Sequence, residues 1–472
     1  MSEPEDLRRL AASLFVVGFP GLEAPGVTLR LVEDGVAGVI YFARNAQNAE
    51  QVARLSATLL DRARPRQLLI AADEEGGLVS RLPRGPARMP GAMALGAAGD
   101  PALARRAAAA TAGQLRAVGI NVDLAPVLDL GGRDSAIGTR SFAADPDAVA
   151  ALGAAWIQGL QDGGVLAVAK HFPGLGTTPV DSHLARPVLA PPEVSLVPFR
   201  AAIGVGVAAV MVAHAAIPDL DPSGEPASRS RPVVEGLLRG RMGFGGLVMT
   251  DCLEMQGATA DVTVSEAAVR AVAAGADLVL ISHRPDLQVA AVDAVATALA
   301  EGRLSIERAR AAAERVAAAV RRFGLAGRGN PDPDAAPFLL DRPSDRALAR
   351  EVAERALTCV RAGALPSDGD ICVVSRGVPG LAEALGVSTA APANGQTVVV
   401  GLGRSPAPDL LQSFPGHELY VWCISPAAAA AALAAGARAV WIGYDDAPAS
   451  VGVAADALWG RLSGTGRLPV SL

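Results

Sequence analysis

The residues best suited to chemistry gather in one stretch of the chain, VAKHFPGLGTTPVDSHLARP at positions 168–187. An apolar run before it predicts a buried strand that ends in Lys170 and His171, and the Gly- and Pro-rich residues that follow predict a loop. Asp181 and His183 lie two residues apart on that loop. A carboxylate at this spacing can orient an imidazole that exchanges protons near neutral pH. The alternative is an Asx-type turn with a surface histidine.

Further polar residues follow other apolar runs. Asp251 ends the run GFGGLVMTD, where it could act as a nucleophile, as a stabilising anion, or as the N-cap of the next helix. Asp73 begins the acidic segment DEE, in which at least one carboxylate is expected to face solvent because like charges rarely share a buried site without cations. We expect Asp73 to bind a polyhydroxylated ligand, and Glu75 only to brace the turn. Arg140 could hold hydroxyls or a carbonyl, or form a surface salt bridge.

The elements that must position these side chains repeat along the first part of the chain. Short apolar runs alternate with Ala-, Leu- and Arg-rich helical stretches up to about residue 323. Continuous apolar strands between helices are typical of a parallel sheet covered on both faces, and seven or eight such units favour a (β/α)8, TIM-like barrel. Strands are expected at 14–18, 36–42, 67–73, 121–128, 165–171, 208–214, 246–251 and 277–282, and helices at 48–64, 101–118, 145–162, 264–274 and 305–323.

The polar residues share one position relative to these strands. Each lies at or just past the carboxyl end of an expected strand, the end of a barrel that carries the active site. Random placement would scatter them over both ends and the helices. The convergence predicts an enzyme, and the residues concerned are Asp73, Glu74, Lys170, His171, His214, Asp251, Ser282 and His283.

The rest of the chain predicts a second, smaller domain. Residues 324–343 are rich in Pro and Gly, which indicates a linker between a catalytic barrel at 1–323 and an α/β/α sandwich at 344–472. Gly401 and Gly403 follow one of its strands, but the third glycine and the acidic residue of a nucleotide loop are missing, so an ordinary turn is expected. We expect scaffolding or dimer contacts from this domain. It should contain a helix at 344–361 and strands at 371–375, 397–402, 419–425 and 439–444.

The composition excludes several classes of partner. A net charge of −6 without a basic stripe argues against nucleic acid. The first residues do not resemble a signal peptide, and no run is long enough to cross a bilayer. The four cysteines are scattered without metal-site spacing, which suggests buried thiols in a reducing cytosol. We therefore expect a cytoplasmic monomer or homodimer with no metal site.

The motifs together resemble the β-N-acetylhexosaminidases of glycoside hydrolase family 3. KHFPGLGTTPVDSH is similar to that family's K-H-F-P-G-H-G-x-T-x-x-D-S-H signature, and ADEEGGLVSRL is similar to its D-x-E-G-G-R-V-x-R segment. NVDLAPVLDL with IGTRSF, PASRSRPVV, GFGGLVMTDCLEM and GRLPVSL recur there in the same order. The resemblance therefore spans both expected domains.

The resemblance implies a cofactor-free, retaining exo-β-N-acetylglucosaminidase that acts on muropeptide or chitooligosaccharide fragments. Asp251 would form a covalent glycosyl-enzyme, and His183, paired with Asp181, would be the general acid/base. A histidine acid leaves less negative charge near the anomeric carbon, so phosphate could compete with water and phosphorolysis stays open. Substrate binding would fall to Asp73, Arg81, Arg140, Lys170, His171 and His214.

Three positions depart from the family pattern. Leu175 replaces a histidine and Thr177 an aspartate inside the catalytic loop, while Leu78 replaces an arginine and should remove a cation near Asp73. Two alternatives therefore stay open. One is a β-glucosidase or β-xylosidase of the same family, whose acid is a glutamate of the second domain. The other is a sugar-binding homologue that has lost catalysis.

Overall fold

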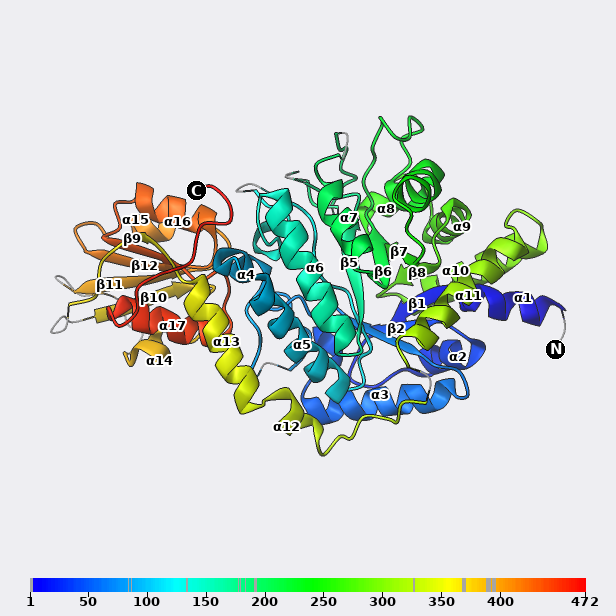
Figure 1. Cartoon of the computed structure of the whole chain (residues 1–472), viewed down its shortest axis with the longest axis horizontal. Helices are drawn as coiled ribbons and strands as arrows, with labels where there is room; N and C mark the ends of the chain where they lie inside the picture. The colour runs from blue at the N-terminus through cyan, green and yellow to red at the C-terminus, as the bar shows by residue number, and fades with distance from the viewer. Residues whose placement is uncertain are drawn as a thin grey trace.

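The chain builds two sheets, a closed eight-stranded parallel barrel and a separate five-stranded sheet, which lie side by side in Figure 1. The computed structural model describes residues 3–83, 85, 87–132, 135–176, 178, 180–182, 184–190, 193–325, 327–366, 371–387, 392 and 396–472. The predicted fold class, a TIM-like barrel followed by a smaller α/β domain, is confirmed.

Barrel strands are short and buried. Each pairs in parallel with the next, and β1 pairs with β8 to close the barrel. Alternate residues face opposite sides: Val16 belongs to the cluster inside the barrel, whereas Phe15 and Val17 pack with the surrounding helices. The strands are β1 (Phe15–Gly18), β2 (Gly38–Tyr41), β3 (Leu69–Ala72), β4 (Val122–Asp123), β5 (Leu166–Phe172), β6 (Ala209–Val212), β7 (Leu247–Cys252) and β8 (Leu278–Ile281).

Helices surround the barrel in the order expected from the sequence. Several begin at a side-chain cap, for example Asn48, which accepts a hydrogen bond from the Gln51 N–H at the start of α3. No helix among the described residues combines the length and hydropathy that a membrane crossing requires. The helices are α1 (Glu3–Ala12), α2 (Gly26–Asp34), α3 (Ala49–Ala63), α4 (Ala92–Ala98), α5 (Pro101–Ala117), α6 (Pro146–Asp162), α7 (Leu196–Gly204), a π-helical segment (Pro232–Arg241), α8 (Gln256–Thr259), α9 (Val264–Ala274), α10 (Pro285–Ala300) and α11 (Ile306–Arg322).

The second sheet has the strand order β10-β11-β12-β13-β9. Helices α15 and α16 lie on one side of it, and α14 and α17 on the other (Figure 1). Alternate residues of β11 serve the two faces, since Val398 and Val400 pack toward α16 and Val399 toward α17. The strands are β9 (Thr358–Arg361), β10 (Ile371–Arg376), β11 (Thr397–Leu402), β12 (Leu419–Cys423) and β13 (Ala439–Ile442), and the helices are α13 (Pro343–Ala356), α14 (Leu381–Leu385), α15 (Pro408–Gln412), α16 (Pro426–Ala434) and α17 (Pro448–Leu458).

One predicted element of this domain is wrong in part. The helix expected at 344–361 ends at Ala356, and Thr358–Arg361 forms strand β9, antiparallel to β13. Thr358 and Val360 are β-branched and favour a strand, and the Thr358 hydroxyl accepts a hydrogen bond of 2.7 Å from Tyr444. Short helix α12 (Ala336–Leu340) lies within the predicted linker.

The two units pack against each other through polar and apolar contacts. Met93, on barrel helix α4, shares an apolar cluster with Val400 and Ile442 of the second sheet. Beside it the Arg88 guanidinium donates to Asp446 at 2.7 Å, and both side chains are almost completely buried. These contacts hold the second sheet next to the carboxyl end of the barrel.

We expect Arg88→Gln to weaken this interface. Its removal leaves the Asp446 carboxylate buried without its cation, so the free energy of unfolding should fall by about 1.5–3 kcal/mol. Chemical denaturation monitored by fluorescence measures the change. The control is Arg105→Gln, which breaks an exposed pair with Asp162 and should change stability by less than about 0.5 kcal/mol. Equal stabilities of both variants would contradict the role given to Arg88.

Candidate active site

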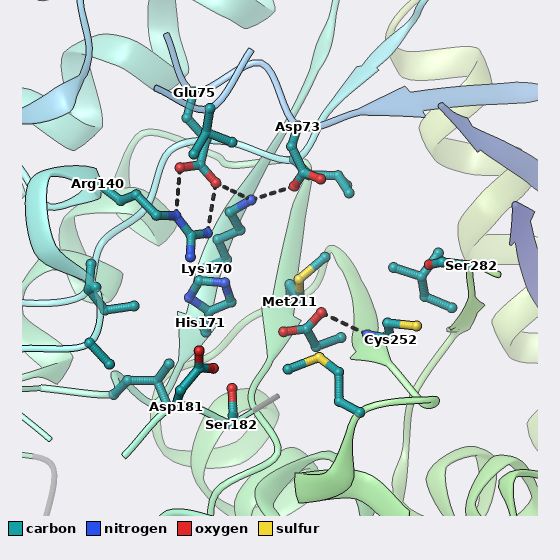
Figure 2. A pocket seen from close by; sticks show the side chains of 18 of the residues that line it. Asp73, Glu75, Arg140, Lys170, His171, Asp181, Ser182, Met211, Cys252 and Ser282 are labelled. Carbon is teal, nitrogen blue, oxygen red and sulfur yellow. Dashed lines mark hydrogen bonds and ion pairs between the residues drawn. The ribbon is translucent and has the colours of Figure 1, made fainter. Parts of the chain in front are cut away.

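A pocket of about 460 Å³ opens at the carboxyl ends of the barrel strands (Figure 2). Its walls come from the segments that follow β3, β5, β7 and β8, so distant parts of the sequence meet there. Most of the site residues predicted from the sequence line it, namely Asp73, Arg81, Arg140, Lys170, His171, Asp181 and Asp251. His183 and Thr177 lie outside the described residues.

Asp251 is held in the pocket by the end of β7. One of its carboxylate oxygens accepts the N–H of Cys252 at 2.7 Å. It does not cap a helix, because α8 begins at Gln256 after Met255. Burial alone would raise the pKa of Asp251, but nearby His171, His214 and Lys170 and the Cys252 N–H outweigh burial and lower it. Asp251 is therefore an anion that faces the pocket at neutral pH.

Two carboxylates and two cations form a cluster on one wall of the pocket. Lys170 Nζ lies 2.7 Å from Asp73 Oδ1 and 2.6 Å from Glu75 Oε1. Arg140 binds the same Glu75 with two guanidinium nitrogens, at 2.9 and 2.8 Å (Figure 2). The expectation that Glu75 only braces a turn was wrong, because this carboxylate neutralises both cations.

In this cluster burial and ion pairing shift the pKa values in opposite directions, and ion pairing has the larger effect. Burial disfavours the charged Lys170, yet Asp73 and Glu75 raise the pKa of its ammonium group above the ordinary value. Burial likewise disfavours ionised Glu75, yet Arg140 and Lys170 hold the pKa of that carboxyl well below its usual range. Lys170, Glu75 and Arg140 are therefore charged over the physiological range, and their geometry is fixed before a ligand arrives.

Asp73 is the carboxylate of the acidic segment with the most exposed side chain. Its side chain is 17% exposed, against 4% for Glu75, and its second oxygen lies 3.7 Å from the Arg81 guanidinium. Glu74 is buried and accepts the backbone N–H groups of Arg81 and Leu82, and burial raises its pKa. Asp73 can therefore accept hydrogen bonds from ligand hydroxyls while Glu74 secures the turn behind it.

His171 is oriented by a residue that the sequence analysis did not select. Its Nδ1 lies 2.6 Å from Asp129 Oδ2, and the other oxygen of this fully buried carboxylate accepts the Leu175 N–H at 2.7 Å. The ring is thereby fixed against the pocket wall. The signal for Asp129 was available, because it directly follows the apolar residues Val127 and Leu128, just as Asp251 follows an apolar run of its own.

The loop that carries the predicted acid borders the opening. Asp181 and Ser182 line the pocket on the side opposite Glu75 and Asp73 (Figure 2). The Ser182 carbonyl accepts the N–H of Gly257 at 3.1 Å, so the loop is tied to helix α8 at this point. An ionised carboxylate, a cavity of about 460 Å³ and the segment that carries Asp181 are thus brought together at one end of the barrel.

Comparisons with known proteins agree with this geometry. Residues 26–319 match the family model "Glycosyl hydrolase family 3 N terminal domain". The chain belongs to glycoside hydrolase family 3. It is similar to the β-hexosaminidases of Xylella fastidiosa strain 9a5c (41% identity over 56% of this chain and 82% of that protein) and Stenotrophomonas maltophilia strain K279a (41%, 56% and 81%). It is also similar to the solved family 3 β-N-acetylglucosaminidase of Paenibacillus sp. str. FPU-7, with a TM-score of 0.92 and 35% identity over 99% of each chain. The predicted glycoside hydrolase is thereby confirmed.

One predicted substrate-binding residue of this family 3 enzyme lies elsewhere. His214 is fully buried and does not line the pocket. Its Nδ1 is 2.7 Å from the Ser228 hydroxyl, and its Nε2 is 3.0 Å from the Cys252 carbonyl oxygen. The prediction that His214 contacts the substrate directly was therefore wrong. His214 instead braces the backbone next to Asp251.

The buried His214 should make stability depend on pH. Burial lowers the pKa of its imidazole, whereas an unfolded chain takes up the proton at about pH 6.5. Because the unfolded state then binds more protons, stability is full above that pH and falls as the pH drops below it, by up to about 1.4 kcal/mol per unit. Urea titrations of wild type and His214→Gln between pH 7 and 5 test this. Parallel pH profiles for the two proteins would contradict it.

Two of the three departures from the family pattern, Leu175 and Leu78, have structural reasons. Leu175 is buried in a small apolar cluster with Val127 and Ile137, so its side chain fills space beneath the loop. Leu78 packs against the apolar core of the second domain. The arginine that Leu78 was expected to remove is not needed to give Asp73 a cation, because Lys170 and Arg81 supply positive charge there.

Three possible metal ligands of the enzyme meet at the rim, although sequence spacing had suggested none. Cys252, Glu254 and His283 each place a ligand atom within 4.8 Å of the others, a set of donors that Zn²⁺ could use. Glu254, however, already accepts the backbone N–H groups of Ser282, His283 and Arg284 at 2.7–2.9 Å. Burial also raises the pKa of the Cys252 thiol to about 12. The contacts show Glu254 as an anchor for the turn after β8.

Proposed function

We propose that this enzyme is a retaining exo-β-N-acetylglucosaminidase that removes terminal N-acetylglucosamine from muropeptide or chitooligosaccharide fragments. The observation that carries the proposal is the ionised Asp251 in a pocket whose opposite sides hold a charged, hydroxyl-binding cluster and the Asp181 loop. The named activities of its relatives, β-hexosaminidase and β-N-acetylglucosaminidase, support the choice of sugar.

In the first half of the reaction an Asp251 oxygen attacks the anomeric carbon. The bond from that carbon to the glycosidic oxygen breaks, and the oxygen takes a proton from the acid on the 181–183 loop, which we assign to His183 oriented by Asp181. In the second half, the same base removes a proton from water, and the resulting oxygen displaces Asp251 from the anomeric carbon. Two inversions return the β configuration.

The charged cluster positions the sugar for this displacement. Asp73 can accept hydrogen bonds from hydroxyls, and Lys170 and Arg140 can donate to sugar oxygens, with Glu75 fixing both cations. His171, held by Asp129, adds a ring nitrogen on the same wall. Because these side chains are already fixed before the substrate binds, the binding energy can be used to align the anomeric carbon with Asp251.

We also propose that the enzyme acts in the cytoplasm, in the recycling of cell-wall fragments. The four cysteines all belong to the described residues and form no disulfide there, which is usual for proteins of a reducing compartment.

Turnover of 4-nitrophenyl N-acetyl-β-glucosaminide by wild type and His183→Ala tests the proposal, with the corresponding glucoside beside it. We expect hydrolysis of the N-acetylglucosaminide and a loss of about 10²–10⁴-fold in the variant, the range for a general acid/base. Preference for the glucoside, or activity indifferent to His183, would place the acid elsewhere. Absence of turnover on both substrates would indicate a sugar-binding protein.

A further inference from the structure

We propose that Arg404, in the second domain, determines substrate specificity by binding an anionic group carried on the aglycone. The group would be a carboxylate or phosphate ester, and the bond would be a charge-assisted hydrogen bond from the guanidinium. This role rests on the proposed glycosidase function and adds a substrate class to it. It also gives the second domain a part in recognition beyond the scaffolding expected from the sequence.

Arg404 is the one described residue of the second domain that lines the active-site pocket. It follows Gly403 in the turn directly after β11, which ends at Leu402, and two hydrogen bonds fix the backbone there. The Gly403 N–H donates to the Arg376 carbonyl at 2.8 Å, and the Ser425 hydroxyl donates to the Arg404 carbonyl at 3.0 Å. The side chain is therefore directed from a rigid turn rather than from a free loop.

The Arg404 guanidinium has no hydrogen-bond or ion-pair partner within the described parts of the chain. Its neighbour Arg376 is paired with Asp409 at 2.8 Å, and Arg140 already makes two hydrogen bonds to Glu75. Burial and then Arg140 lower the pKa of Arg404, whereas the carboxylates of Glu75 and Asp446 raise it, and an arginine remains charged at neutral pH. The wall of the pocket thus presents a cation with unused donors.

The placement of Arg404 points to the aglycone rather than to the sugar. Arg404, Ala136 and Ile137 line both the active-site pocket and an adjoining cavity of about 200 Å³. The same segment supports the acid loop, because the Ala136 N–H donates to the Thr178 carbonyl at 3.1 Å. Since the acid must reach the leaving-group oxygen, the aglycone departs on the side of that loop, next to the segment that shares both cavities with Arg404.

The adjoining cavity offers room and a favourable potential for an anion. Its described lining contains no carboxylate. Ser425 and Pro426, at the start of helix α16, form part of it, so the positive end of that helix adds to the charge of Arg404. A free phosphate ion has the same chemistry as a phosphate ester, and the experiment below separates the two sources.

The test uses two chromogenic substrates, 3-carboxy-4-nitrophenyl N-acetyl-β-glucosaminide and its methyl ester. Wild type should show a higher kcat/KM for the carboxylate, and Arg404→Gln should lower that value about 10- to 100-fold more than the value for the ester, mainly through KM. Arg404→Lys should restore part of the discrimination. Arg376→Gln, which breaks a surface pair of the same domain, is the control and should behave as wild type.

Three results would overturn this role. Equal losses on both substrates in Arg404→Gln would mean that the residue acts only through structure. Equal kcat/KM values for the carboxylate and the ester in wild type would show that the enzyme does not recognise an anionic group on the aglycone. An effect of Arg404→Gln confined to sugar phosphate formed in added inorganic phosphate, measured by ³¹P NMR, would assign the residue to a free acceptor anion. Failure of the proposed function is distinct, because wild type would then hydrolyse neither ester nor carboxylate.

Discussion

Asp251→Asn should lower kcat on an aryl N-acetyl-β-glucosaminide by about 10⁴- to 10⁶-fold, which is the range expected when an enzyme loses its nucleophile. An amide has nearly the same shape but cannot form the glycosyl ester. Because Asp251 accepts one backbone N–H and caps no helix, the substitution should leave the fold intact. Steady-state kinetics with circular dichroism on the same samples measures both. The matched control is Asp61→Asn on the surface, which should retain full activity.

Asp251→Gly distinguishes a nucleophile from a merely stabilising anion. The smaller side chain leaves room for azide, which should restore turnover and give the α-glycosyl azide by a single inversion. If Asp251 only stabilised positive charge, azide would not take its place as the attacking group, and no α-azide would form. Residual activity of Asp251→Asn within about tenfold of wild type would also contradict the assignment.

Lys170→Met should have the largest effect on stability. The ammonium group is 2% exposed and lies within 2.7 Å of both Asp73 and Glu75. Without it two carboxylates lose their shared cation in a buried site, and breaking such an arrangement from one side costs about 3–5 kcal/mol. Activity should fall as well, because the hydroxyl-binding wall loses its charge balance. Equilibrium unfolding in urea gives the free energy, and Arg62→Met, from an exposed pair with Glu33, is the control.

The pH dependence checks the cause of that loss. Pairing holds the pKa of Glu75 below its unfolded value, so its contribution to stability is present above about pH 4.3 and is lost as the pH falls toward the folded pKa. The difference between wild type and Lys170→Met should therefore be largest near neutrality and shrink in acid. The double variant Lys170→Met/Glu75→Gln should recover part of the loss. Additive effects of the two changes would contradict direct coupling.

Much of the barrel and its charged wall could be predicted because their signals are local. Each barrel strand is a short apolar run, and a polar residue at its carboxyl end must face the same pocket in a closed parallel barrel. Asp73, Lys170 and Asp251 were found in this way. His214 obeys the same rule and yet turns inward to Ser228 and Cys252, since a strand end alone does not fix the direction of a side chain.

Features that depend on contacts between distant segments could not be read from local patterns. Glu75 gains its role from Arg140 and Lys170, which lie 65 or more residues away. Leu78 is explained only by the apolar core of the second domain. Arg404 lies in a glycine turn that carries no catalytic pattern, and its relevance arises because the second domain packs beside the mouth of the barrel.

The most direct test of the account is to trap the intermediate. A 5-fluoro-N-acetyl-β-glucosaminyl fluoride reacts as a substrate, but the ring fluorine slows hydrolysis of the ester, so the glycosyl-enzyme accumulates. Digestion and mass spectrometry should then find one sugar on the peptide that contains Asp251, and none in Asp251→Asn. A label on another carboxylate, or no label while the substrate turns over with inversion, would contradict the claim that Asp251 is the nucleophile of a retaining enzyme.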